Sequence, residues 1–313
     1  MGGVVRKIQL LQDIGEFGLI DRLKQFIRSD RSVLVGIGDD TAVVKVGRRA
    51  RAILFTTDML IEGRHFKLED ATPFEIGRKA LAVNLSDIAA MGGIPTHAVV
   101  ALGLPSRLEV RFVKALYRGM ETLARRYGVR IVGGDTNASD RLVISVAMIG
   151  EVSAKGAVRR SGARRGDFIF VTNSLGGAIR SKKHLRFVPR LKEAQFLVRN
   201  FKIHSMIDIS DGLASDIHRL AAASRVGAVL FESMIPVSRA AKNVKQALTE
   251  GEDFELLFTL PAKDAARLAR HPMDGRIARF TCIGRIMSGG YGVRIRDARG
   301  RLRRLAEKGY EHF

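Results

Sequence analysis

Hydrophobic and polar positions follow two different spacings along the first half of the chain. Short apolar runs rich in β-branched residues predict strands over residues 33–37, 42–46, 51–57, 96–104, 129–133 and 142–150. Longer stretches with helical spacing predict helices over 74–91 and 108–127. A polar, glycine-containing stretch without periodicity begins at Glu151, so we place a domain boundary between residues 150 and 151.

The second half continues with short apolar runs separated by helical patterns. Strands are predicted over 167–172, 206–210, 227–231, 254–260, 281–286 and 292–297. The Lys- and Arg-rich segment from 180 to 203 is interpreted as one amphipathic helix between turns. These patterns predict an α+β protein with two domains, residues 1–150 and 151–313, in which mixed sheets are covered by helices.

Length and composition agree with two globular domains. The chain has 313 residues, of which 46% are hydrophobic, and its mean hydropathy is +0.02. No apolar run approaches the length needed to cross a bilayer, and the first residues lack the continuous apolar stretch of a signal peptide. We therefore expect a cytoplasmic protein. The single cysteine, Cys282, has no partner for a disulfide and is interpreted as a small hydrophobic residue in a buried strand.

The charge balance is strongly basic. Lys and Arg total 53 against 32 Asp and Glu, a net charge of +21 that favours anionic partners. The basic residues are scattered in ones and twos and aromatic residues make up only 6%, which is atypical of a nucleic-acid-binding surface. A basic enzyme acting on phosphorylated substrates is the favoured interpretation, without a specific nucleic-acid partner. An RNA-associated protein is the alternative from a different class.

Acidic residues stand at the ends of otherwise apolar strands. They are Asp39 and Asp40, Asp58, Asp135, Asp208 and Asp211. A further carboxylate, Asp87, shares one face of a predicted helix with Asn84. Isolated carboxylates in apolar surroundings need a cationic partner, and Mg²⁺ prefers hard oxygen ligands. Each Asp alone could cap a helix or form a turn, but the set together predicts a site for magnesium and phosphate built from both halves.

Other nucleotide and metal signatures are missing from the sequence. It contains no GxxxxGK[ST], no HRD or DFG element and no HExxH, and the nearest approach to GxGxxG, at Gly36, breaks at Thr41. The P-loop, protein-kinase, Rossmann and zinc-hydrolase classes therefore lose support.

Eight segments of the chain resemble one known family in their amino-acid sequences and in their order. They read GIGDDTAVV, FTTDMLIEGRHF, KALAVNLSDIAAMGGIP, IVGGDT, RRSGARRGD, MIDISDGLASDI, GEDFELLFT and GYEHF. This set is similar to the thiamine-monophosphate kinases and extends over nearly the whole chain. The resemblance implies a two-domain PurM-like fold and a homodimer joined through the N-terminal domains. It also implies transfer of the γ-phosphoryl of ATP to thiamine monophosphate, giving thiamine diphosphate and ADP.

The resemblance implies roles for particular residues. The implied magnesium ligands are Asp40, Thr56, Thr57, Asp58, Asp87, Asp135, Asp208 and Asp211. The implied ATP contacts are Tyr117, Gly134, Asp135, Arg160 and Ser210. His65 and Glu252 are the implied contacts to thiamine monophosphate, and Asp39 is a weaker candidate than Asp40. No residue is expected to form a covalent intermediate, since the implied reaction is a metal-assisted in-line transfer.

The chain departs from the family pattern in two places. Relatives tend to have an aromatic residue, often Trp, shortly before the final Gly-Tyr, where this chain has Glu307 and no Trp; Tyr310 is the candidate replacement. The segment between Gly177 and Met206 is short and unusually basic. Selenophosphate synthetases and hydrogenase-maturation relatives need cysteines that this chain lacks. Aminoimidazole-ribotide synthetase is the remaining enzyme alternative.

Overall fold

Two mixed sheets form the framework of the molecule. The computed structural model describes residues 10–27, 30–46, 51–152, 156–271 and 277–311. The first sheet has the order β1-β2-β3-β6-β4-β5, and all its neighbouring strands are antiparallel except β4 and β5. Its strands are β1 (Val33–Val35), β2 (Ala42–Val46), β3 (Arg51–Ile61), β4 (Ile94–Leu104), β5 (Arg130–Ala138) and β6 (Val143–Glu151).

The second sheet has the order β13-β12-β9-β11-β7-β10-β8 and is antiparallel apart from the pair of β12 and β9. Its strands are β7 (Phe168–Thr172), β8 (Ser205–Asp208), β9 (Gly227–Phe231), β10 (Leu256–Leu260), β11 (Phe280–Met287), β12 (Val293–Arg296) and β13 (Leu302–Arg304). The α+β class with mixed sheets is thereby confirmed. Cys282 lies in β11 and its side chain is half-buried.

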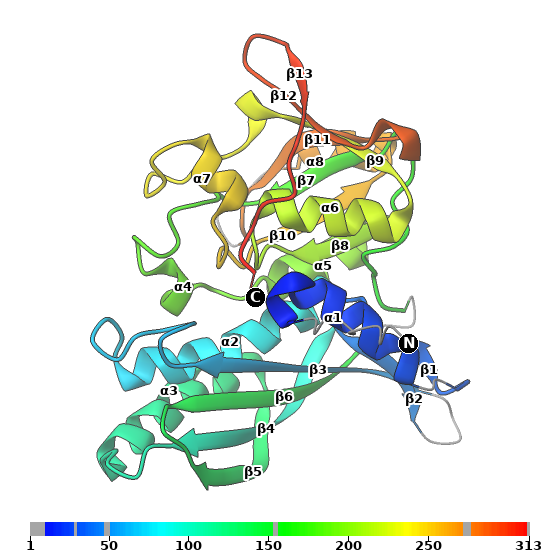
Figure 1. Cartoon of the computed structure of the whole chain (residues 1–313). Coiled ribbons are helices and arrows are strands. Elements are labelled where there is room, and N and C mark those ends of the chain that lie inside the picture. The colour runs from blue at the N-terminus through cyan, green and yellow to red at the C-terminus, as the bar shows by residue number, and fades with distance from the viewer. Residues whose placement is uncertain (1–9, 28–29, 47–50, 153–155, 272–276, 312–313) are drawn as a thin grey trace, which may run out of the picture.

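Helices cover the sheets and join them. They are α1 (Gly15–Leu23), α2 (Pro73–Ala90), α3 (Val110–Tyr127), α4 (Lys183–Arg186), α5 (Leu191–Asn200), α6 (Leu213–Ser224), α7 (Val244–Thr249) and α8 (Ala262–Ala269). Figure 1 shows α2 and α3 beside the first sheet and α6 beside the second, with α1 crossing between the two halves. Residues 1–9, to which the signal-peptide expectation applies, lie outside the described residues. Within the described part of the chain, no helix is long and apolar enough to cross a membrane.

The prediction of one helix over residues 180–203 is wrong. Two helices, α4 and α5, occupy this segment, and the chain between them is extended at Phe187, whose ψ is 155°. Pro189 stands in this break. Proline disfavours helical conformation in the residue before it, so a helical pattern of side chains is interrupted by the backbone here.

Helix α2 lies between the two sheets. It begins with a capping box in which the Thr72 hydroxyl accepts from the Glu75 N–H, and Pro73 occupies its first turn. Nearly its whole circumference is buried, because it packs on α3, β3 and β6 on one side and on α4, α5 and β8 on the other. A Cβ at Gly77 would lie 1.9 Å from the Leu116 carbonyl oxygen, so glycine is required for the close approach of α2 and α3.

One apolar core runs through both halves. Buried side chains of α2, such as Leu81 and Ile88, belong to the same cluster as Leu197 of α5 and Phe258 of β10. The two sheets are therefore held together by shared packing rather than by a linker alone.

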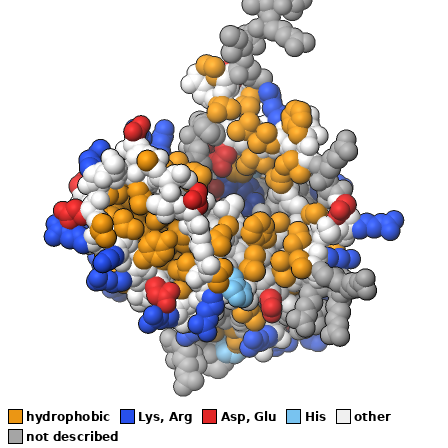
Figure 2. Space-filling model, turned by 90° about the horizontal axis from the view of Figure 1, so that it is seen from below, with side chains coloured by type: hydrophobic (Ala, Val, Ile, Leu, Met, Phe, Trp, Pro, Cys, Tyr) orange, Lys and Arg blue, Asp and Glu red, His pale blue; other side chains and the backbone are white. Residues whose placement is uncertain are grey.

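The face of the first sheet that α2 and α3 leave uncovered exposes several large apolar side chains. Phe55 and Met59 of β3, Val99 of β4 and Val132 of β5 are 49%, 54%, 42% and 62% exposed. Figure 2 shows hydrophobic side chains gathered on the molecule as seen from below, the side on which β4 and β5 lie in Figure 1. We call this side of the sheet, marked by these four residues, the open face.

Candidate functional site

A pocket of about 950 Å³ lies where the two sheets meet. We call it the central pocket. It is lined by residues from the β1–β2 loop, β3, α2, the segment after β6, the end of β8 and the loop that follows β8. Segments that are distant in sequence, from both halves of the chain, thus contribute to one cavity, as the prediction of a site built from both halves requires.

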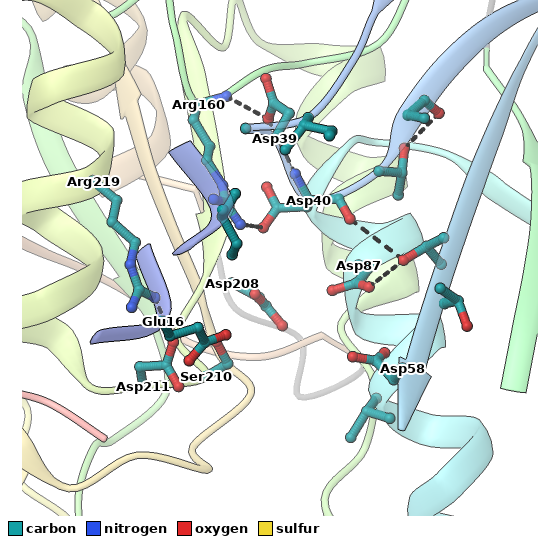
Figure 3. A pocket seen from close by; sticks show the side chains of 18 of the residues that line it. Glu16, Asp39, Asp40, Asp58, Asp87, Arg160, Asp208, Ser210, Asp211 and Arg219 are labelled. Atoms are coloured by element: carbon teal, nitrogen blue, oxygen red, sulfur yellow. Dashed lines mark hydrogen bonds and ion pairs between the residues drawn. The ribbon is translucent and has the colours of Figure 1, made fainter. Parts of the chain in front are cut away.

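Four carboxylates point toward one another inside this pocket (Figure 3). Asp40 follows β1, Asp58 lies on β3, Asp87 on α2 and Asp208 at the end of β8. One oxygen of each of Asp40, Asp87 and Asp208 lies within 4.8 Å of the others, and Asp58 is close enough to Asp87 for its charge to raise the pKa of Asp87. We call these four residues the carboxylate cluster.

Burial and mutual repulsion raise the pKa values of the cluster. Burial raises the pKa of Asp208 to about 7, with the charge of Asp40 adding to it, and raises the pKa of Asp58 to about 6. The pKa of Asp87 lies well above its ordinary value, because the group is buried and faces Asp58, Asp208 and Asp40. The four charges therefore oppose one another in the protein alone.

The protein provides hydrogen-bond or ion-pair partners for only some of the carboxylate oxygens in the cluster. Arg160 Nη2 donates to Asp40 Oδ1 at 2.8 Å, and Ser86 Oγ donates to Asp208 Oδ2 at 2.5 Å. The other carboxylate oxygens of Asp40 and Asp58, both Oδ2, are buried and have no hydrogen-bond partner. Orphaned buried carboxylate oxygens are what a hard divalent cation would ligate, so the cluster fits Mg²⁺.

The two threonines predicted as ligands lie on opposite faces of β3. Thr56 Oγ1 donates to Asp87 Oδ2 at 2.6 Å and is buried beside the cluster. The Thr57 hydroxyl instead lies 3.5 Å from Ser145 Oγ on β6, at an exposed position. Of the two, only Thr56 has its side chain against the carboxylate cluster.

Asp211 and Ser210 lie at the other end of the central pocket, in the loop before α6. Asp211 is paired with Arg219 of α6 (Figure 3). Arg219 also bonds Asp216 at 2.8 Å. The Arg219 guanidinium lies over the Phe17 ring of α1, with 4.1 Å between its carbon and the ring centre. Arg219 was not predicted as a site residue, because nothing in the sequence distinguishes it from the other scattered arginines.

His65 and Glu252 also line the central pocket. The His65 Nδ1 accepts from the Ile61 N–H at 2.9 Å, which fixes the ring orientation. Glu252 has a φ of 70°, unusual for a residue with a side chain, and its N–H donates to the Ser210 carbonyl at 2.6 Å. Tyr310, the candidate replacement for the missing aromatic residue, lines the same pocket, whereas Glu307 does not.

Three predicted residues do not line the central pocket: Tyr117, Gly134 and Asp135. Asp135 pairs with Ala101 of β4 on the open face, whereas Asp58 pairs with the buried Val146. Asp135 thus lies on the opposite face of the sheet, and β6 and β4 separate its strand from β3. Asn84 bonds the Ala80 carbonyl of its own helix and does not line the pocket either.

Comparisons with known proteins agree with this architecture. The chain matches the family model described as AIR synthase related protein, N-terminal domain, over residues 38–152, and the one described as AIR synthase related protein, C-terminal domain, over residues 142–295. The fold and the pocket between its halves therefore define an AIR synthase related protein of the PurM-like class.

Individual relatives narrow this class. The thiamine-monophosphate kinase of Rhodopirellula baltica is 36% identical, over 90% of this chain and 92% of its own length, and that of Bacillus subtilis is 35% identical over 95% and 99%. A solved structure, "AaThiL complexed with AMPPCP and TMP", is 32% identical and matches 98% of this chain and 100% of its own with a TM-score of 0.84. The chain belongs to the thiamine-monophosphate kinase family.

Proposed function

We propose that this protein transfers the γ-phosphoryl group of ATP to thiamine monophosphate and releases thiamine diphosphate and ADP. The observation that carries this proposal is the carboxylate cluster with orphaned oxygens in a pocket between the two halves, in a chain of this family. The relatives named as thiamine-monophosphate kinases support thiamine monophosphate as the acceptor. The related structure in complex with AMPPCP and TMP supports both ATP and thiamine monophosphate as substrates. We also propose that the protein acts in the cytoplasm, where ATP is available to it.

We propose that Asp40, Asp58, Asp87 and Asp208 hold Mg²⁺, with Asp211 as a further ligand. Bound magnesium would neutralise phosphate oxygens that otherwise repel one another. The protein's own residues position the carboxylates: Thr56 holds Asp87 and Ser86 holds Asp208. Arg160 and Ser210, which line the pocket, are proposed to contact ATP.

Phosphoryl transfer onto thiamine monophosphate needs no general base. The acceptor phosphate is already ionised near neutral pH. The contribution of the protein is therefore to bring donor and acceptor together and to balance their charge. His65 is accordingly proposed to be a substrate contact, together with Glu252, and not a base.

The choice of acceptor tests the proposed function. We expect the purified protein to form thiamine diphosphate from ATP and thiamine monophosphate, and to use free thiamine poorly because it lacks a phosphate. A coupled assay of ADP release, run with thiamine monophosphate, thiamine and aminoimidazole precursors, measures this. Equal turnover of free thiamine, or ADP release only with the aminoimidazole precursor, would overturn the assignment.

We also propose a homodimer formed through the open face. A broad exposed apolar surface on a sheet is unusual for a monomer and typical of an interface. Asp135 and Gly134 lie on the strand at the edge of this sheet, so we propose that Asp135 reaches a magnesium site only across the dimer. Packing also requires glycine at position 134, since a Cβ there would lie 1.8 Å from the Val100 carbonyl oxygen.

Sedimentation at assay concentration is expected to report about twice the chain mass of 34.4 kDa. Val99→Glu is expected to yield a monomer, because it places a charge in the middle of the apolar surface. Val110→Glu, at a residue of α3 that is 71% exposed, is the matched control and should remain dimeric. A fully active wild-type monomer would remove the dimer proposal and leave the chemistry intact.

The division of the chain at residues 150 and 151 is retained as a proposal. The first sheet ends with Glu151 and the second begins with Phe168. The proposed boundary lies one residue before the end of β6, in the stretch of chain that leads from the first sheet to the second.

A further inference from the structure

One lysine is completely enclosed between the two halves of the molecule. The side chain of Lys79, in the middle of α2, has 0% exposure and is among the largest fully buried side chains of the described residues. Lysine is rarely buried without a partner, because desolvating its charge is costly. Its surroundings must therefore provide specific compensation.

The two groups that Lys79 bonds both belong to residues of the central pocket. Its Nζ donates to the His65 carbonyl at 2.7 Å and forms an ion pair with Glu252 Oε2. His65 comes from the loop after β3, and Glu252 from the loop before β10. Lys79 therefore joins two pocket loops from opposite halves of the chain.

The loop that carries Glu252 is held in an unusual conformation. Both Glu252 and Phe254 have positive φ values, of 70° and 49°. Their N–H groups donate to the carbonyls of Ser210 and Ile209, at 2.6 and 2.8 Å. Such conformations persist only where the surroundings impose them. The backbone bonds fix the loop, and the ion pair with Lys79 fixes the direction of the Glu252 carboxylate.

Lys79 has no access to the central pocket, but Glu252 does. The Glu252 side chain is 22% exposed and lines that pocket, near the charges of Asp58 and Asp211. Without a cation behind it, the Glu252 carboxylate would be repelled by these acidic groups. Lys79 thus acts on the pocket only through Glu252.

The position of Lys79 along α2 also relates it to the carboxylate cluster. Asp87 follows Lys79 by eight residues, a little over two turns and about 12 Å along the helix. One rigid element therefore sets the separation between the cluster, proposed to hold phosphate through magnesium, and the carboxylate at Glu252.

We propose that Lys79 is a positioning residue for the acceptor substrate: it holds Glu252 so that the carboxylate receives the cationic thiazolium part of thiamine monophosphate. This inference rests on the proposed function and deepens it. ATP, which has no cationic ring, gains nothing from this arrangement. Lys79 therefore determines acceptor affinity and not nucleotide affinity.

The test compares KM values for the two substrates in Lys79→Met. We expect the KM for thiamine monophosphate to rise at least about tenfold, because breaking a buried ion pair releases the carboxylate from its bound position. The KM for ATP should change less than about twofold. Lys183→Met is the matched control: Lys183 pairs with Asp253 and Glu255, outside the central pocket, and its loss should lower the melting temperature and leave both KM values unchanged.

A double-mutant cycle with Glu252→Gln separates positioning from general support of the fold. If Lys79 acts through Glu252, Lys79→Met should have little further effect on the KM for thiamine monophosphate once Glu252 is Gln. Additive effects, or an equal rise in both KM values, would overturn the proposal. Should Lys79→Met fail to fold, Lys79→Arg decides in the same assay, because it keeps the charge and displaces its centre; an unchanged KM for thiamine monophosphate would then overturn the proposal.

The outcome is distinguishable from failure of the proposed function. Wild-type turnover of thiamine monophosphate tests that function by itself. Binding of thiamine monophosphate to the wild type and to Lys79→Met without ATP, measured by calorimetry, gives the same comparison without turnover. An active wild type with equal affinity in the variant contradicts the role of Lys79 alone.

Discussion

Asp58→Asn and Asp87→Asn are each expected to lower turnover by at least about a hundredfold while raising the melting temperature of the metal-free protein. Asn keeps the size of the side chain and removes the charge that is proposed to hold magnesium against the phosphates. Each 1.36 kcal/mol lost from transition-state stabilisation is a factor of ten, and poorly screened phosphate repulsion costs several kcal/mol. Stability should rise because both carboxylates have raised pKa values and repel their neighbours.

The control for these two variants is a buried carboxylate that lies outside the central pocket. Asp167 is 3% exposed, accepts from the Arg164 N–H at 2.8 Å and pairs with His204, and it does not line the central pocket. Asp167→Asn should therefore lose stability and retain most turnover. Turnover is measured across a magnesium titration, and melting temperatures are measured separately in EDTA. Near-wild-type rates at saturating magnesium in Asp58→Asn and Asp87→Asn would refute the metal assignment.

The metal-free protein is expected to become less stable as the pH rises from 6 to 8. The pKa of Asp208 is about 7 in the folded protein, against 3.8 without the fold, so the folded state binds more protons across this interval. The free energy of unfolding therefore falls as Asp208 loses its proton, by an amount on the order of 1 kcal/mol between pH 6 and 8. For a chain of this size the melting temperature should fall by about 2 °C.

Melting curves in EDTA at both pH values measure this effect, and Asp208→Asn is the control because it cannot titrate. Excess Mg²⁺ should stabilise the wild type more at pH 8 than at pH 6, since the cation replaces the missing protons. An identical pH dependence in wild type and Asp208→Asn would assign the loss of stability to other groups.

Much of the carboxylate cluster could be predicted from the sequence. Acidic residues after apolar runs stand out because burial of a charge needs a reason, and Asp40 and Asp208 lie where that reasoning places them. The face of the sheet on which each residue lies is harder to predict. Asp58 and Asp135 follow similar apolar runs, yet the strand order and register place them on opposite faces.

Other features depend on contacts that no local pattern encodes. Helix α1 was not predicted, although Glu16 and Phe17 line the central pocket. Lys79 lies in a correctly predicted helix. Its spacing of eight residues from Asp87, a little over two turns, indicates that both residues lie on similar sides of that helix. Its burial, however, depends on the loop of Glu252, more than 170 residues away in the sequence. The break at Pro189 could have been predicted from the rule that the residue before proline avoids helical conformation.

The position of α2 has a consequence for synthesis on the ribosome. Domains generally fold as units during translation, with the N-terminal one first. Here the side of α2 that packs on α5 and β8 acquires its partners only after residue 208 has been made. The nascent first half must therefore expose a hydrophobic helix surface to solvent for more than one hundred residues of elongation. Chaperone binding to the growing chain would have its natural target on this surface.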